Sequence, residues 1–140
     1  MGLEGGFGVI MGDIDHFKNI NDTYGHITGD FVLAKISQIL TECLRDTDVI
    51  GRYGGEEFLM ICHVKDLHAL KSIAQRMREN IANHDFKFQG NNLSITMSFG
   101  VVYIKYNDAE ITSEKVISMV DQQLYASKSN GRNRVTAIES

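Results

Sequence analysis

Apolar residues recur along the chain in two patterns, one typical of helices and one typical of strands. A spacing of three or four residues predicts amphipathic helices, because such residues share one helical face. The predicted helices are residues 29–45, 67–83 and 113–131. Short apolar runs bounded by polar residues or glycine predict strands. The predicted strands are residues 7–14, 48–53, 58–64, 93–101 and 134–138.

Caps and turns refine the boundaries of these elements. Asp66 and Ser113 stand at the starts of predicted helices, and both side chains are suitable N-caps. The glycine-rich residues 54–57 separate two predicted strands and suit a tight hairpin. Residues 93–101 alternate apolar and polar side chains, which predicts one buried face and one polar face.

The order of the predicted elements indicates an α+β domain with helices stacked on a mainly antiparallel central sheet. A hairpin between consecutive strands excludes a purely parallel sheet. A chain of 140 residues without internal repeats suits one domain. We expect this domain to span residues 7–140, and residues 1–6 to be a junction outside it.

Composition and charge exclude several classes of partner. A net charge of -4 without a basic tract argues against nucleic acid and against an anionic membrane surface. No apolar stretch approaches the roughly 20 residues of a membrane span, so we expect no membrane contact by this domain. The alternative of a membrane anchor elsewhere in a parent protein stays open. Cys43 and Cys62 lie within apolar patterns and are expected to be buried thiols, consistent with a reducing cytoplasm.

Four segments in a fixed order resemble the GGDEF family of diguanylate cyclase catalytic domains. Residues 54–58, Gly-Gly-Glu-Glu-Phe, resemble the signature that names the family. The other matching segments are residues 13–30, 95–100 and 124–133. One pentapeptide can match by chance, so the ordered set carries the resemblance. It implies a nucleotidyl-cyclase or palm-like fold with a ferredoxin-like core, and the condensation of two GTP molecules into cyclic di-GMP and two pyrophosphates.

The resemblance implies a catalytic metal site at Asp13 and the hairpin acids. Asp13, Glu56 and the backbone carbonyl of Ile14 would bind Mg²⁺, Glu57 would help to hold a second ion, and Glu56 would promote deprotonation of the 3′-hydroxyl. Carboxylates are ligands that Mg²⁺ prefers, and two ions about 4 Å apart neutralise attacking and leaving oxygens. Mn²⁺ is the alternative metal. A solvated acidic turn is the alternative for the hairpin alone.

Phosphate binding is expected where the first strand passes through a turn into a short helix. Free N–H groups there would cradle phosphates, and the resemblance assigns this role to Phe17, Lys18, Lys128 and Arg132. Lys128 and Arg132 are four residues apart, so they could share one face of the third helix. The alternative is that both cations only complement the negative end of that helix.

The resemblance assigns guanine recognition to Asn21 and Asp30. A carboxylate accepts hydrogen bonds from N1–H and the 2-amino group of guanine, whereas adenine presents an acceptor at N1. Asp30 therefore favours GTP over ATP. Considered locally, both residues are equally good caps and turn formers.

The spacing of Arg45 and Asp48 matches the family's Arg-x-x-Asp inhibitory site for cyclic di-GMP. Arg45 could bind a guanine edge or a phosphate, and Asp48 could accept from guanine. Arg76 aligns with a secondary contact of that site. The alternative for Arg76 is an ordinary exposed helix arginine.

The resemblance also implies partners. One GTP site per chain and a symmetric product indicate a catalytic homodimer, and an upstream sensory domain is expected in the parent protein. Family members carry a leading helix before the first strand that nothing in this sequence matches, so we expect the domain to lack it. Two alternatives stay open: a regulatory module that binds GTP or cyclic di-GMP without chemistry, and a cyclase acting on ATP.

Overall fold

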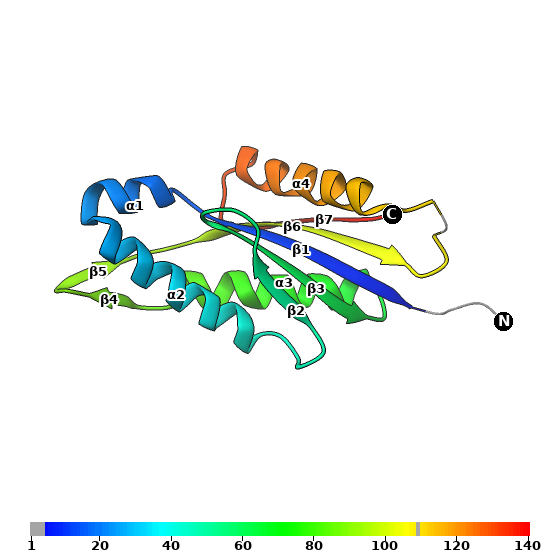
Figure 1. Ribbon diagram of the computed structural model, residues 1–140, viewed down its shortest axis with the longest axis horizontal. Coiled ribbons are helices and arrows are strands. Elements are labelled where there is room, and N and C mark those ends of the chain that lie inside the picture. The colour runs from blue at the N-terminus through cyan, green and yellow to red at the C-terminus, as the bar shows by residue number, and fades with distance from the viewer. Residues whose placement is uncertain (1–4, 109) are drawn as a thin grey trace.

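A five-stranded sheet forms the centre of the computed structural model, which describes residues 5–108 and 110–140. The strands follow the order β2-β3-β1-β6-β7 across the sheet (Figure 1). They are β1 (Gly6–Ile14), β2 (Val49–Arg52), β3 (Glu57–Val64), β6 (Met97–Lys105) and β7 (Val135–Glu139). β1 runs antiparallel to β3 and β6, whereas β7 runs parallel to β6. The predicted α+β class with a mainly antiparallel sheet is confirmed.

The first strand begins one residue earlier than predicted. Gly6 pairs with Val64 of β3 and with Lys105 of β6, so it belongs to the sheet. Gly6 is the last residue of the expected junction at residues 1–6. Residues 1–4 of that expected junction lie outside the described residues.

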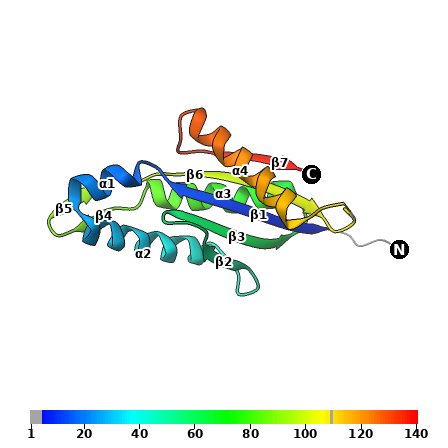
Figure 2. The same cartoon turned by 45° about the horizontal axis from the view of Figure 1, so that its top comes forward.

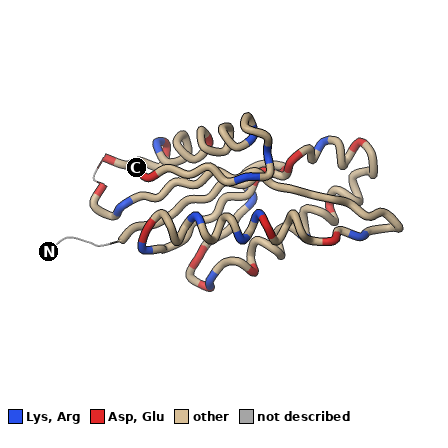
Figure 3. Tube along the Cα trace, turned by 180° about the vertical axis from the view of Figure 1, so that it is seen from behind, with Lys and Arg blue, Asp and Glu red and all other residues tan. Residues whose placement is uncertain are grey.

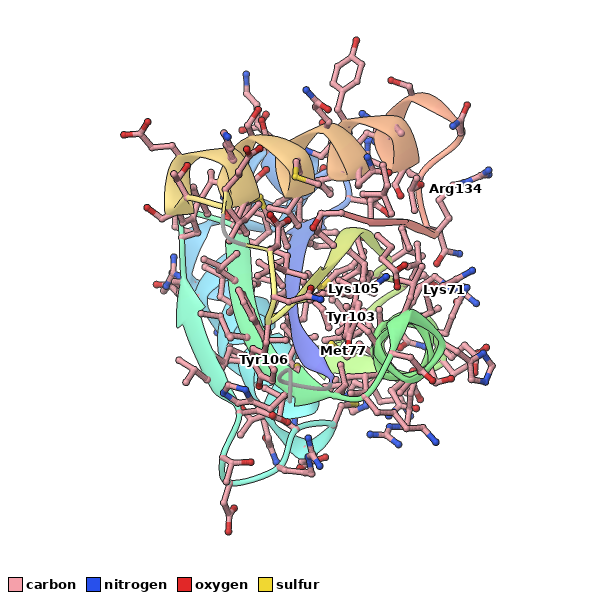
Figure 4. All side chains as sticks on the ribbon, turned by 90° about the vertical axis from the view of Figure 1, so that its right-hand side faces the viewer. Lys71, Met77, Tyr103, Lys105, Tyr106 and Arg134 are labelled. Carbon is pink, nitrogen blue, oxygen red and sulfur yellow. The ribbon has the colours of Figure 1, made fainter. Side chains whose placement is uncertain are left out.

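Helices cover both faces of the sheet. They are α1 (Phe17–Tyr24), α2 (His26–Glu42), α3 (Leu67–Ala82) and α4 (Ser113–Ser129). One core lies between the sheet and the pair α2 and α3, and a second core lies under α4. Figure 4 shows α4 and α3 on opposite sides of the strands. Among the described residues, no helix combines the length and the apolar character that crossing a bilayer requires.

The predicted polar face of residues 93–101 is wrong. β6 begins only at Met97, and every residue from Met97 to Ile104 is buried. The reason is that α4 covers one face of this central strand and α3 the other, so both sets of side chains are enclosed. Ser98 is fully buried and is satisfied by a hydrogen bond of 2.6 Å from its hydroxyl to Asp15 Oδ1.

Helix starts confirm one predicted cap and correct another. The Asp66 carboxylate accepts a hydrogen bond of 2.8 Å from the Ala69 N–H at the start of α3, as predicted. Thr112, not Ser113, caps α4, because its hydroxyl accepts from the Lys115 N–H three residues ahead. α2 begins three residues earlier than predicted, since the break before it falls at Gly25 with φ 92°.

A small second sheet, which the sequence pattern did not reveal, supports α2. It consists of β4 (Phe86–Phe88) and β5 (Asn91–Leu93), joined through Gln89 and Gly90, both with positive φ. The ring of Phe88 stacks on that of Phe31 in α2, with centroids 4.4 Å apart. Figure 2 shows this hairpin beside the corner where α1 meets α2. The contact helps to position the start of α2, where Asp30 lies.

The two cysteines are buried free thiols, as predicted. Burial raises the pKa of Cys62 to about 12, with the nearby negative charge of Asp48 adding to the effect. A Cys43→Ser variant leaves Cys62 as the one thiol of the chain. At pH 8, we expect the fraction of Cys62 that is thiolate to be about 10³-fold lower in the native state of this variant than in its unfolded state. Reaction with a chromogenic disulfide, followed with and without guanidinium, measures this difference. Equal rates in the two states would contradict it.

Candidate active site

Asp13 lies near the end of the central strand β1 and is 5% exposed. Its neighbours in register are Glu57 on β3 and Ser98 on β6. The Lys128 ammonium reaches it from α4, with Nζ 2.6 Å from Asp13 Oδ2. Figure 3 shows basic and acidic positions meeting where the end of α4 approaches the end of β1. Asp13 is thus a nearly buried carboxylate balanced by one cation.

The hairpin between β2 and β3 places two further carboxylates beside Asp13. The Glu57 carbonyl accepts from the Tyr53 N–H at 2.8 Å, and the Glu56 carbonyl accepts from the Ile14 N–H at 3.3 Å. Burial, followed by the negative charge of Asp13 and a hydrogen bond to it, raises the pKa of Glu56. Burial and Asp13 likewise raise the pKa of Glu57. The site therefore concentrates negative charge beyond what Lys128 neutralises.

A pocket of about 190 Å³ opens at this point. Its lining residues are Asp13, Ile14, Asp15, His16, Phe17, Lys18, Glu56, Lys128 and Arg132. The predicted metal and phosphate residues other than Glu57 are thus brought together. The predicted shared helical face of Lys128 and Arg132 is wrong, because α4 ends at Ser129 and Arg132 lies in a turn with φ 63°. This turn nevertheless places Arg132 in the lining of the same pocket.

The oxygen donors of this pocket fit a magnesium ion that completes its ligands with substrate. Among residues 5–108 and 110–140, no three His, Cys, Asp or Glu side chains form a ready metal site. Mg²⁺, however, usually binds through one or two carboxylates together with substrate phosphates. Asp13 and Glu56 supply two crowded carboxylates, and Ile14 lines the same pocket.

The residues predicted to contact guanine lie at the corner between α1 and α2, outside the lining of this pocket. Asn21 is half-buried and Asp30 is exposed. A Cβ on Gly29 would collide with the Asn21 side-chain oxygen, so the Asn21 side chain packs directly against Gly29 of α2. This contact brings Asn21 next to the turn of α2 that carries Asp30.

The residues predicted to form an inhibitory site line a separate, larger cavity of about 950 Å³. The Arg45 N–H donates to Asp48 Oδ2 at 2.9 Å, and the Arg45 guanidinium donates to the His63 carbonyl. Arg76 donates to the Cys43 carbonyl at 2.8 Å. The Asp48 side chain is 1% exposed, yet its Oδ1 has no hydrogen-bond partner among the residues that the structure describes. The structure therefore brings Arg45, Asp48 and Arg76 together.

Comparison with known proteins identifies the family of this chain. The family model described as "Diguanylate cyclase, GGDEF domain" matches residues 4–134. The chain belongs to the GGDEF family. Its relatives include diguanylate cyclase A of Treponema denticola, 41% identical over 128 residues, and diguanylate cyclase DgcP of Pseudomonas aeruginosa, 44% identical over 123 residues.

These alignments cover 91% and 88% of this chain but only 34% and 18% of the two relatives. The GGDEF domain of DgcB from Caulobacter crescentus, solved in complex with c-di-GMP, has the same fold. It superposes with a TM-score of 0.87 at 33% identity, covering 94% of this chain and 77% of that chain. The predicted family and fold are thereby confirmed.

Asp15 is a residue of this GGDEF domain whose role the sequence analysis missed. It is 7% exposed, and its carboxylate accepts from the hydroxyls of Thr96 and Ser98, each at 2.6 Å. It also accepts from the Asn133 N–H at 3.0 Å, in the left-handed turn that carries Arg132. Asp15 thus joins the end of β1 to the Arg132 turn. The only signal in the sequence was a second acid two residues after Asp13.

Replacing Asp15 by Asn should lower stability. Because Oδ2 accepts from both the Thr96 hydroxyl and the Asn133 N–H, the amide oxygen must take that place and the NH₂ group the place of Oδ1. The Ser98 hydroxyl, which donates to Oδ1, would then lose its buried acceptor, at a cost of about 2 kcal/mol. Urea denaturation measures the loss. Asp22→Asn, at an exposed position of α1, is the matched control and should leave the unfolding midpoint nearly unchanged. Equal midpoints for the two variants would contradict a structural role for Asp15.

Proposed function

We propose that this chain is a diguanylate cyclase catalytic domain that converts two GTP molecules into cyclic di-GMP and two pyrophosphates. In each half of the reaction a 3′-oxygen forms a bond to the α-phosphorus of the other GTP. The bond from that phosphorus to the pyrophosphate oxygen breaks, and the 3′-hydroxyl proton leaves. The observation that carries this proposal is the meeting of Asp13, Glu56 and Lys128 at one pocket.

In this proposal Asp13, Glu56 and the Ile14 carbonyl hold Mg²⁺ or Mn²⁺, and Glu57 helps to hold a second ion. Bound metal would supply charge neutralisation at the attacking and leaving oxygens. Glu56 promotes removal of the 3′-hydroxyl proton, a role that a carboxylate beside the reacting centre can fill.

Two backbone N–H groups and three side chains bind the triphosphate in this proposal. The first N–H groups of α1, at Phe17 and Lys18, have no partner within the helix and suit a phosphate. Lys18, Lys128 and Arg132 add positive charge from three segments around the same pocket. Lys128 balances Asp13 when no nucleotide is bound.

Asn21 and Asp30 select guanine in this proposal. The Asn21 amide contacts Gly29, which directly precedes Asp30, so an amide and a carboxylate lie at the same corner of the domain. Asp30 accepts from the N1–H and 2-amino groups of guanine, so ATP should be a poor substrate.

We infer that catalysis requires a homodimer. The described residues of one chain form one pocket with this lining, whereas the ring of cyclic di-GMP requires two GTP molecules that attack each other. Two domains with their pockets face to face meet this requirement. The relatives are much longer than this chain, so we expect the parent protein to carry an upstream sensory domain that controls this pairing.

We further propose that cyclic di-GMP binds the cavity of Arg45, Asp48 and Arg76 and inhibits the enzyme. The unpartnered Oδ1 of Asp48 is a buried acceptor beside a cavity of about 950 Å³. Guanine N–H groups would satisfy this atom, and the Arg45 guanidinium suits a guanine edge or a phosphate.

The test is to incubate the chain with GTP and Mg²⁺ and to quantify cyclic di-GMP and pyrophosphate by chromatography. We expect one cyclic di-GMP for every two pyrophosphates, no comparable turnover of ATP, and a rate that rises more steeply than linearly with dilute protein. Binding of a non-hydrolysable GTP analogue without turnover would favour a regulatory binding module. A linear concentration dependence across the dissociation range would exclude the homodimer.

A further inference from the structure

The wall of the larger cavity contains an aromatic group that the proposed product site does not use. Tyr106 follows the end of β6, lines the cavity and is 41% exposed (Figure 4). An exposed tyrosine contributes little to the core. Its position beside a cavity already proposed to take guanine suggests a role in ligand binding.

Two contacts hold the Tyr106 side chain in place, and a third holds its backbone. Its hydroxyl lies 2.9 Å from His63 Nδ1, and its ring lies 6.3 Å from that of Phe7 at an angle of 30°. The Tyr106 N–H donates to the Gly5 carbonyl at 3.3 Å. A partly exposed ring fixed in this way is preorganised to accept a planar ligand.

His63 connects this ring to the proposed guanine-binding arginine. Its carbonyl accepts from the Arg45 guanidinium, while its imidazole bonds the Tyr106 hydroxyl. All three residues line one cavity together with the unpartnered carboxylate oxygen of Asp48. The residues of this lining thus include a guanidinium, an acceptor for N–H groups and an aromatic side chain, three kinds of group that recognise a purine.

We propose that Tyr106, oriented by His63, stacks on a guanine base of cyclic di-GMP in this cavity. The inference rests on the proposed product site and adds the aromatic platform for its base. Base–aromatic stacking contributes about 1–3 kcal/mol per base, which corresponds to a change of about 5- to 150-fold in affinity.

Titration calorimetry with cyclic di-GMP tests the stacking. We expect Tyr106→Leu to weaken binding by at least about 5-fold and Tyr106→Phe, which keeps the ring, to bind within about 3-fold of the wild type. Tyr125→Leu is the matched control, because Tyr125 is 73% exposed on α4 and lines none of the pockets described above. It should bind as the wild type does.

Tyrosine fluorescence provides a second measurement that needs no destabilising variant. The chain has no tryptophan and five tyrosines, so its emission reports on tyrosine alone. Stacking predicts quenching on addition of cyclic di-GMP, after correction for nucleotide absorbance, and loss of most of this quenching in Tyr106→Phe. Identical quenching in the two proteins would overturn the proposal.

Arg45→Ala separates failure of this inference from failure of the product site. If Arg45→Ala loses affinity while Tyr106→Leu binds as the wild type does, the stacking is wrong and the product site stands. If neither variant loses affinity, the product site itself is wrong and the stacking fails with it.

Discussion

Glu56→Gln should reduce cyclic di-GMP synthesis by about 10³-fold while leaving the fold intact, since removing one group that stabilises transition-state charge commonly has an effect of this size. The amide keeps the shape of the side chain but cannot supply the negative charge that a divalent ion needs. Because burial and Asp13 raise the pKa of Glu56, its charge is disfavoured in the metal-free protein. The variant should therefore melt at the same temperature as the wild type or slightly higher when metal is absent.

Product formation from GTP and Mg²⁺ and thermal melting in a chelator are the two measurements. Glu114→Gln, at an exposed position in the first turn of α4, is the matched control and should keep wild-type activity. Glu56→Gln with activity near that of the wild type would remove Glu56 from the proposed chemistry. An inactive variant with a much lower melting temperature would instead indicate a structural role.

Helical periodicity was clearest in a helix with one covered face. The helical pattern of α3 was recognisable because its apolar residues face the core and the opposite side of the helix is exposed to solvent. The buried residues are Leu70, Ala74, Met77 and Ile81. The prediction of an exposed polar face for β6 failed because both faces of this strand are buried. Ser98 is polar because it makes a buried hydrogen bond, and not because it is exposed to solvent. The burial of both faces of β6 depends on the packing of α3 and α4, which the local sequence pattern does not encode.

The acids and cations of the site were predictable by type, but their pairings were not. The 2.6 Å contact between Lys128 and Asp13 joins residues 115 positions apart, and only the packing of α4 on the sheet creates it. The Asp15 bond to the Asn133 N–H likewise depends on a left-handed turn that returns the chain to β1. Long-range geometry of this kind follows from the fold and not from spacing in the sequence.

Gly100→Ala should lower the free energy of unfolding by about 3 kcal/mol, because overpacking a closely packed contact costs this much when backbone must shift. A Cβ at this position of β6 would collide with the Leu124 nitrogen and the Val120 carbonyl oxygen of α4. These are backbone atoms, so no side-chain rotation relieves the clash. α4 would have to move away from the sheet, carrying Lys128 away from Asp13.

Urea denaturation followed by circular dichroism measures the loss, and Gly51→Ala is the matched control. Gly51 also lies in a strand, β2, but a Cβ there has no heavy atom within 4 Å. Alanine is no worse than glycine in extended backbone, so the difference between the variants isolates the contact with α4. Gly51→Ala should stay within about 0.5 kcal/mol of the wild type. Equal stability of the two variants would show that α4 does not require its close approach to β6, and the position of Lys128 would then need another cause.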